Sequence, residues 1–202
     1  MLIVDNLRVK RGRHEFHFSL ELSAGEIVAL QGRSGIGKTT LLETIAGYVN
    51  PDSGALSWQD LSLLPLLVEE RPISMLFQDY NFFEHISVAQ NLGLGFRGGI
   101  PERAMKAASA ELQVDDQWEK MPPQLSGGQR QRVALIHCLL RPEPLCLLDE
   151  PFAELDDHNR DRSIRWCSRI ARETGKTVLL VTHQDEDVRK LADRRIELCS
   201  AA

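Results

Sequence analysis

The chain has 202 residues, 43% of them hydrophobic and 26% charged, a usage typical of folded globular proteins. That length suits one ordinary domain, with or without a small inserted lobe, and argues against two full domains. The 24 Lys and Arg residues are outnumbered by 29 Asp and Glu residues, which gives a formal net charge of −5. Because nucleic-acid binding draws most of its affinity from basic residues, this balance argues against nucleic acid as a partner.

Hydrophobic runs in the chain are short. The longest, residues 63–68, is far below the roughly 18 residues needed to cross a bilayer, and residues 1–5 lack the basic lead and long apolar stretch of a secretory signal. We therefore expect no membrane span and a location in the cytoplasm. The four cysteines contain no C-x-x-C pair and are expected to be reduced structural residues. They are Cys138, Cys146, Cys167 and Cys199.

Apolar periodicity in the first part of the chain predicts a series of strands and one helix. Alternation over residues 2–9 and 16–22 is typical of half-buried strands, and the continuous run 27–30 predicts a buried strand. Residues 39–47 have the spacing of a helix, and residues 73–77 predict another short strand. A strand, loop and helix unit is therefore expected to start at the buried run.

The second part of the chain begins with helical patterns and returns to strands. Residues 87–94, 102–112 and 129–140 favour helices. Strands are predicted again at 145–148 and 178–181, and an amphipathic stretch separates them. Strands that alternate with helices in this way favour a parallel sheet.

We expect one domain over residues 1–202, without internal repeats. Its α/β core would be formed by residues 1–80 and 142–202. The residues between, about 81–141, would form a helical insertion.

The loop after the buried strand at 27–30 matches the pattern G-x-x-x-x-G-K-[ST]. Its glycines let backbone N–H groups surround phosphates, and the following helix start adds partial positive charge. Lys38 would reach the β- and γ-phosphates, Thr39 would supply a hydroxyl ligand to Mg²⁺, and Thr40 adds a further candidate for phosphate binding. A chance match in a chain of this length has a probability on the order of 1%. The loop consists of Gly32, Arg33, Ser34, Gly35, Ile36, Gly37, Lys38 and Thr39.

An acid pair ends the strand predicted at 145–148. Ligands of open α/β sheets bind at the carboxyl ends of strands, which is where Asp149 and Glu150 stand. Asp149 would hold Mg²⁺ through water, and Glu150 would orient a water that attacks the γ-phosphate. The alternative is a surface acid pair that merely closes a buried strand.

A second candidate for anion binding precedes the helix predicted at 129–140. Here a serine and two glycines could place helix N–H groups against a phosphate. No lysine follows, so this element can be only half of a nucleotide site. It consists of Ser126, Gly127, Gly128 and Gln129, after Leu125.

Together these motifs resemble, in order and spacing, the ATP-binding subunit of ABC transporters. The resemblance covers nearly the whole chain. It implies an α/β fold, with a P-loop ATPase core, an inserted α-helical subdomain and an N-terminal β-subdomain. The matching elements are Gly32–Thr39, Gln78, Leu125–Gln129, Leu145–Glu150, Ala153–Asp156 and His183.

The resemblance further implies a head-to-tail homodimer with two ATP molecules at its interface. Each ATP would bind the loop of one subunit and be closed by Ser126 and Gly128 of the other. Gln78 would sense Mg²⁺ and water, and His183 would touch the γ-phosphate. Asp156 would lie in a loop that crosses the dimer and couples the two sites.

The same resemblance implies ATP-driven transport at the cytoplasmic face of the inner membrane, together with permease subunits and a solute-binding protein. Residues 71–78 and 87–95 are most similar to the ATPase subunit of bacterial thiamine importers. A small solute, with thiamine as the candidate, is therefore expected as cargo. Three alternatives stay open: the ATPase of an exporter, a soluble ABC-type ATPase of DNA repair or translation, and a P-loop kinase of a small metabolite.

Two further segments each allow more than one interpretation. In Asp79–Phe83 the aromatic residues either anchor the loop to the core, or at least one of Phe82 and Phe83 contacts the membrane subunit. The family usually stacks an aromatic residue on adenine, but Arg11 stands near that place. Arg11 itself, His14 or Phe16 could hold the base, or a solvated basic turn could leave adenine loosely bound. Many relatives continue beyond this chain's end, so we expect any regulation to act through partners.

Overall fold

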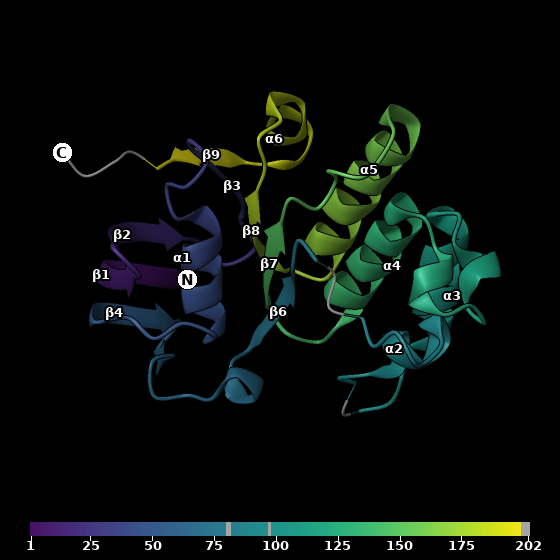
Figure 1. The fold of residues 1–202 in the computed structure, drawn as a ribbon, viewed down its shortest axis with the longest axis horizontal. Coiled ribbons are helices and arrows are strands. Elements are labelled where there is room, and N and C mark those ends of the chain that lie inside the picture. Colours follow the sequence, from purple (N-terminus) through teal and green to yellow (C-terminus); the bar gives the residue numbers. More distant parts are fainter. Residues whose placement is uncertain (80–81, 97, 199–202) are drawn as a thin grey trace.

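The computed structural model describes residues 1–79, 82–96 and 98–198, which form two β-sheets and a group of helices (Figure 1). The strands are β1 (Leu2–Arg11), β2 (His14–Leu22), β3 (Ile27–Gln31), β4 (Ser53–Trp58), β5 (Leu61–Ser62), β6 (Ile73–Leu76), β7 (Leu145–Asp149), β8 (Thr177–Val181) and β9 (Arg194–Glu197). The α-helices are α1 (Lys38–Ala46), α2 (Val88–Gly93), α3 (Glu102–Glu111), α4 (Gly127–Leu140), α5 (Asp157–Glu173) and α6 (Asp185–Leu191). Short 3-10 helices are η1 (Val68–Glu70), η2 (Asp115–Gln117) and η3 (Pro122–Gln124).

The larger sheet is parallel, with strand order β6-β7-β8-β3-β9. Both of its faces are covered, so successive residues of one strand enter different hydrophobic clusters. Along β3, Ile27 and Ala29 belong to one cluster, while Val28 and Leu30 belong to the other. Strands buried on both faces read as continuous apolar runs, which is why the sequence predicted β3, β7 and β8 correctly.

The smaller sheet is antiparallel, with strand order β2-β1-β4-β5, and it lies beside α1 (Figure 1). Its inward residues, such as Leu7 and Leu56, share a hydrophobic cluster with Leu41 and Ile45 of α1. The same cluster includes one face of the parallel sheet. This sheet is the N-terminal β-subdomain that the resemblance implied.

Helices α2, α3 and α4 lie between β6 and β7 in the chain and gather on the side of the parallel sheet away from β1 and β2 (Figure 1). They share their core with the sheet, because Val88 and Met105 belong to the same cluster as Leu76 and Leu148. The division into separate units at residues 81–141 stays a prediction. No helix in the described part of the chain is long and apolar enough to cross a membrane.

Some elements differ from the sequence predictions. Helix α4 begins at Gly127 rather than at Gln129, so both glycines lie in its first turn. Strands β4, β5 and β9 and helix α6 were not predicted. Strand β9 contains Arg194, Arg195 and Glu197 and forms the edge of the parallel sheet, where it pairs with β3 alone. An edge strand with exposed charges gives no apolar run, so its sequence resembles a loop.

Candidate functional site

The carboxyl ends of neighbouring strands bring the predicted site residues together. Strands β7, β8 and β3 are adjacent in the sheet and parallel. The phosphate-binding loop follows β3, Glu150 follows β7, and His183 follows β8. Because parallel strands end at the same edge, these segments open onto one cavity of about 620 Å³.

That cavity receives most of the residues predicted to bind or hydrolyse a nucleotide. Some of the predicted site residues do not line it. They are Gly32, Arg33, Ile36, Ser126, Gly127, Gly128, Gln129 and Asp156. The lining residues are Arg11, His14, Phe16, Ser34, Gly35, Gly37, Lys38, Thr39, Thr40, Gln78, Asp149, Glu150, Ala153, Val181 and His183.

The phosphate-binding loop has a backbone that only glycine adopts easily. Gly35 and Gly37 have φ values of 79° and 99°, in the left-handed region. A Cβ on Gly37 would also lie 2.6 Å from Cδ1 of Phe16, so the loop packs tightly under that ring. No side chain caps the start of α1, which leaves its first N–H groups directed toward the loop. Such a helix start is suited to an anion.

Lys38 lies inside this loop and is 7% exposed. Its ammonium donates hydrogen bonds to the carbonyls of Gly32 at 2.8 Å and Arg33 at 3.1 Å. Burial lowers the pKa of Lys38, and the carboxylates of Glu150 and Asp149 act in the opposite sense. An anion in the loop would therefore find a cation that is already desolvated.

Asp149 forms the polar end of β7 and is 2% exposed. Its Oδ2 accepts a hydrogen bond of 2.8 Å from the Thr39 hydroxyl. Burial raises the pKa of Asp149, while the hydrogen bond from Thr39 lowers it. A buried carboxylate beside a hydroxyl is a donor set that fits Mg²⁺, and the Gln78 amide on the same cavity adds a third oxygen.

Glu150 turns out of the sheet with a left-handed backbone, φ 48°. Its Oε1 is buried, has no hydrogen-bond partner, and lies 3.2 Å from Nε2 of His183. Burial raises the pKa of Glu150, and the charge and backbone N–H of His183 oppose that shift. Glu150 also lines the cavity, so its carboxylate group is placed to accept a hydrogen bond from water there, as the predicted role requires.

The serine and glycine element starts α4 outside this cavity. Ser126 is the N-cap: its hydroxyl accepts from the Gln129 N–H at 3.2 Å, and Gln129 Oε1 accepts from the Ser126 N–H at 2.9 Å. A Cβ on Gly127 would lie 2.7 Å from Oε2 of Glu154, so the helix start packs closely on that residue. The structure therefore gives this element a capping role and places it apart from the loop of the same chain.

Asp156 caps α5. Its carboxylate accepts from the backbone N–H of Asn159 at 3.0 Å and from Nδ2 of Asn159 at 2.6 Å. These hydrogen bonds lower the pKa of Asp156. Within one chain this residue has a structural role, and any role between subunits stays a prediction.

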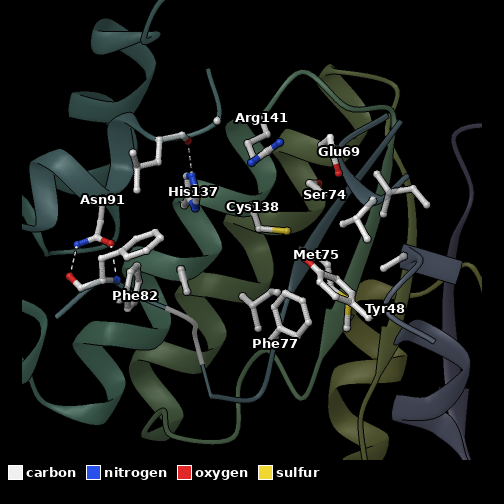
Figure 2. A pocket seen from close by; sticks show the side chains of 18 residues that line it. Tyr48, Glu69, Ser74, Met75, Phe77, Phe82, Asn91, His137, Cys138 and Arg141 are labelled. Carbon is white, nitrogen blue, oxygen red and sulfur yellow. Dashed lines mark hydrogen bonds between the residues drawn. The ribbon is translucent and has the colours of Figure 1, made fainter. Parts of the chain in front are cut away.

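A second cavity, of about 390 Å³, lies between the sheet and the helices (Figure 2). Figure 2 shows Tyr48 and Phe82 on opposite sides of it, with Phe77 between them. Phe82 also packs against the core, whereas Phe83 is 54% and Tyr48 55% exposed. Phe82 therefore supports the interpretation that the aromatic segment anchors its loop to the core, and Phe83 supports the interpretation that a ring is accessible to the membrane subunit. Tyr80 and Asn81 lie outside the described residues.

Sequence reasoning missed Tyr48 as a lining residue of this second cavity. It directly follows Gly47, which ends α1 in a left-handed conformation. An exposed aromatic residue after a helix end was the available signal, but the neighbouring strand β6 is what makes it part of a cavity.

Comparison with known proteins agrees with this geometry. The model of the family described as ABC transporter matches residues 16–153. The chain belongs to the ABC transporter family. It is 42% identical over 199 residues to the thiamine import ATP-binding protein ThiQ of Vibrio cholerae, covering 96% of this chain and 84% of that protein. The ThiQ of a strain of Escherichia coli is 42% identical over 184 residues, covering 89% and 79%.

Solved structures give the same result. The dimeric structure of a post-hydrolysis state of the ATP-binding cassette MJ0796, bound to ADP and Pi, superposes with a TM-score of 0.84 and 28% identity, covering 98% of this chain and 94% of that one. The predicted fold is therefore confirmed, as is the prediction of an ABC-type ATPase of a transporter that binds ATP. Family membership also removes the alternative of a small-metabolite kinase.

The buried carboxyl group of Glu150 should make the stability of the folded chain depend on pH. Its pKa is raised in the fold, so the folded chain binds more protons than the unfolded chain and loses stability as pH rises through that pKa. Glu150→Gln removes the buried charge and should raise the Tm of the nucleotide-free chain at about pH 7.5, where each kcal/mol of added stability corresponds to about 2–4 °C at this chain length. The gain should vanish below the ordinary pKa of 4.5.

Calorimetry across this pH range checks the prediction, with Glu119→Gln, a change at an exposed carboxyl, as the control that should leave Tm unchanged. A Glu150→Gln variant that is no more stable than the parent at neutral pH would contradict a destabilising buried charge.

Arg11, His14 and Phe16, the residues predicted as candidates for holding the base, all line this cavity. Arg11 forms an ion pair with Glu43 of α1, and the Phe16 ring lies against Gly37. A guanidinium or an aromatic ring contacts the face of a base, and every base offers a similar face. Kd values for ATP and GTP should therefore agree within about threefold, because stacking hardly discriminates bases.

Titration with fluorescent analogues of both nucleotides measures this ratio. Arg11→Ala should weaken both nucleotides equally, while Arg13→Ala, a change in the same turn but outside the cavity, should weaken neither. A strong preference for ATP that Arg11→Ala abolishes would show instead that Arg11 reads the edge of adenine.

Proposed function

We propose that this chain is the ATP-hydrolysing subunit of a thiamine importer. The convergence of the phosphate-binding loop, Asp149, Glu150 and His183 on one cavity supports hydrolysis of ATP. The cargo is proposed from the relatives, which are named as thiamine import ATP-binding proteins; the match to the one from Vibrio cholerae covers 96% of this chain.

Each residue of the cavity has a defined part in this proposal. Lys38 and the first N–H groups of α1 bind the β- and γ-phosphates, and the Lys38 ammonium already lies inside the loop that would hold them. Glu150 orients the attacking water through its carboxylate group, because this residue lines the cavity. His183, 3.2 Å from that carboxylate, contacts the γ-phosphate.

Thr39, Asp149 and Gln78 would hold Mg²⁺ with the bound nucleotide. When bound, the ion neutralises phosphate charge and orients the β- and γ-phosphates. The Thr39 hydroxyl and the Asp149 carboxylate are already held together by their hydrogen bond. Their preformed arrangement supports this assignment.

The working unit in this proposal is a head-to-tail homodimer. Ser126, Gly127, Gly128 and Gln129 form an anion-binding helix start that does not line the nucleotide cavity of their own chain. They would instead close over the ATP held by the loop of a second subunit. Asp156, at the N-cap of α5 next to Glu154, would link the two sites. The similar MJ0796 structure is described as dimeric, which supports the pairing.

The remaining partners are a pair of permease subunits and a solute-binding protein. The cavity between the sheet and the helices, with Tyr48 and Phe83 at its exposed rim, would receive a cytoplasmic segment of the permease. Binding of ATP would close the dimer and the attached permease, and hydrolysis would reset both. The chain would then act at the cytoplasmic face of the cell membrane.

The proposal predicts that a polytopic membrane protein co-purifies with the tagged chain from gently solubilised native membranes, and mass spectrometry identifies it. That complex, reconstituted in liposomes with its solute-binding protein, should hydrolyse ATP several-fold faster when thiamine is added. The complex that carries Lys38→Ala should show no such response.

Two results would count against the proposal in different ways. Recovery of soluble partners alone would contradict the coupling to a permease. A membrane complex whose ATP hydrolysis responds to another solute and not to thiamine would contradict the cargo while leaving the importer in place.

A further inference from the structure

Gln131 is a buried amide of α4 that contacts the segment after β7. It lies in the second turn of α4 and is 1% exposed. Its Nε2 donates a hydrogen bond of 2.8 Å to the carbonyl of Glu150, and its Oε1 accepts one of 2.8 Å from the N–H of Glu154. One side chain thus holds both ends of the segment that follows β7.

The backbone of Glu150 depends on such support. It has a left-handed conformation that is costly for a residue with a side chain, φ 48°. Its N–H donates to Val181 at 3.0 Å, and its carbonyl also accepts from Ala153 at 3.3 Å. The bond from Gln131 adds a contact from a different element, α4, to this local turn. Because the direction of a side chain follows its backbone, this contact helps to set where the Glu150 carboxylate points.

The start of α4 is attached to the same segment by close packing. A Cβ on Gly128 would lie 3.1 Å from the carbonyl of Glu154, and one on Gly127 would lie 2.7 Å from the Glu154 carboxylate. The first turn of α4 therefore cannot move along residues 150–155 without breaking the two Gln131 hydrogen bonds or these contacts. Packed contacts of this kind shift together rather than separately.

We propose that Gln131 is a positioning residue that fixes the Glu150 backbone relative to the start of α4, and so ties the orientation of the attacking water to closure of the partner subunit's ATP site. This inference rests on the proposed roles of Glu150 and Ser126. Gln131 does not line the nucleotide cavity, so it would act through the carbonyl of Glu150.

Two variants separate this role from simple loss of a buried amide. Gln131→Met fills a similar volume but makes neither hydrogen bond. Gln131→Asn keeps a buried amide but is one methylene shorter, so it cannot span Glu150 and Glu154 in the same way. The matched control is Gln117→Met, because Gln117 is also a buried amide, 2% exposed, and accepts from Lys120 in the helical region, away from the nucleotide cavity.

Turnover and binding are measured on the full chain with ATP and Mg²⁺, together with the Tm of each variant. Both Gln131 variants should lower kcat by about 10- to 100-fold, because small misplacements of a reacting group cost this much. Their Kd for ATP should stay within about twofold of the parent, as expected when an interaction matters only in the transition state. Gln117→Met should lower Tm to a similar extent and leave kcat unchanged.

Combination with Glu150→Gln shows whether Gln131 acts through Glu150. In that background Gln131→Met should lower kcat no further, because the group it positions has gone. Gln131 variants that keep the parent kcat per folded chain, or that lower kcat equally with and without Glu150, would overturn the inference. A Glu150→Gln chain that turns over ATP like the parent would instead refute the proposed role of Glu150.

Discussion

The hydrogen bond from the Thr39 hydroxyl to the Asp149 carboxylate is the contact on which the nucleotide cavity depends. It joins the first turn of α1 to the end of β7 across 2.8 Å, in a place where Asp149 is almost completely buried. Burial raises the pKa of that carboxyl, so its negative charge is costly unless a hydroxyl or a cation compensates it. The phosphate-binding loop and an acidic strand end are thereby held together at one edge of the parallel sheet.

Around this contact the chain divides its phosphate-binding groups between two places. The loop before α1 opens into the cavity with Glu150 and His183, whereas the helix start at Ser126 lies outside it. In the dimer that we propose, each of these two places would supply half of a nucleotide site, and a second copy of the chain would complete both. Gln131 links the halves within one chain, so that the position of the helix start and the backbone of Glu150 change together.

Much of this organisation can be predicted from the sequence, because it rests on local pattern. The runs at 27–30, 145–148 and 178–181 predict the central strands, since burial on both faces demands continuous apolar residues. The pattern of the phosphate-binding loop predicts its place after the first of these runs. Edge strand β9, with its arginines, and the role of Gln131 could not be predicted in this way. A glutamine in a helix is usually exposed, and only packing of α4 on the segment after β7 buries this one.

The mass of the Glu150→Gln chain in solution, measured by light scattering with ATP and with ADP, tests the central claim most directly. The account predicts a dimer with ATP, because bound nucleotide is retained and each half-site is completed by a second subunit, and a monomer with ADP. Ser126→Arg in the same chain should abolish the dimer while leaving the affinity of the monomer for ATP unchanged. A Glu150→Gln chain that stays monomeric with saturating ATP, or a dimer that persists with Ser126→Arg, would contradict the division of the site between two subunits.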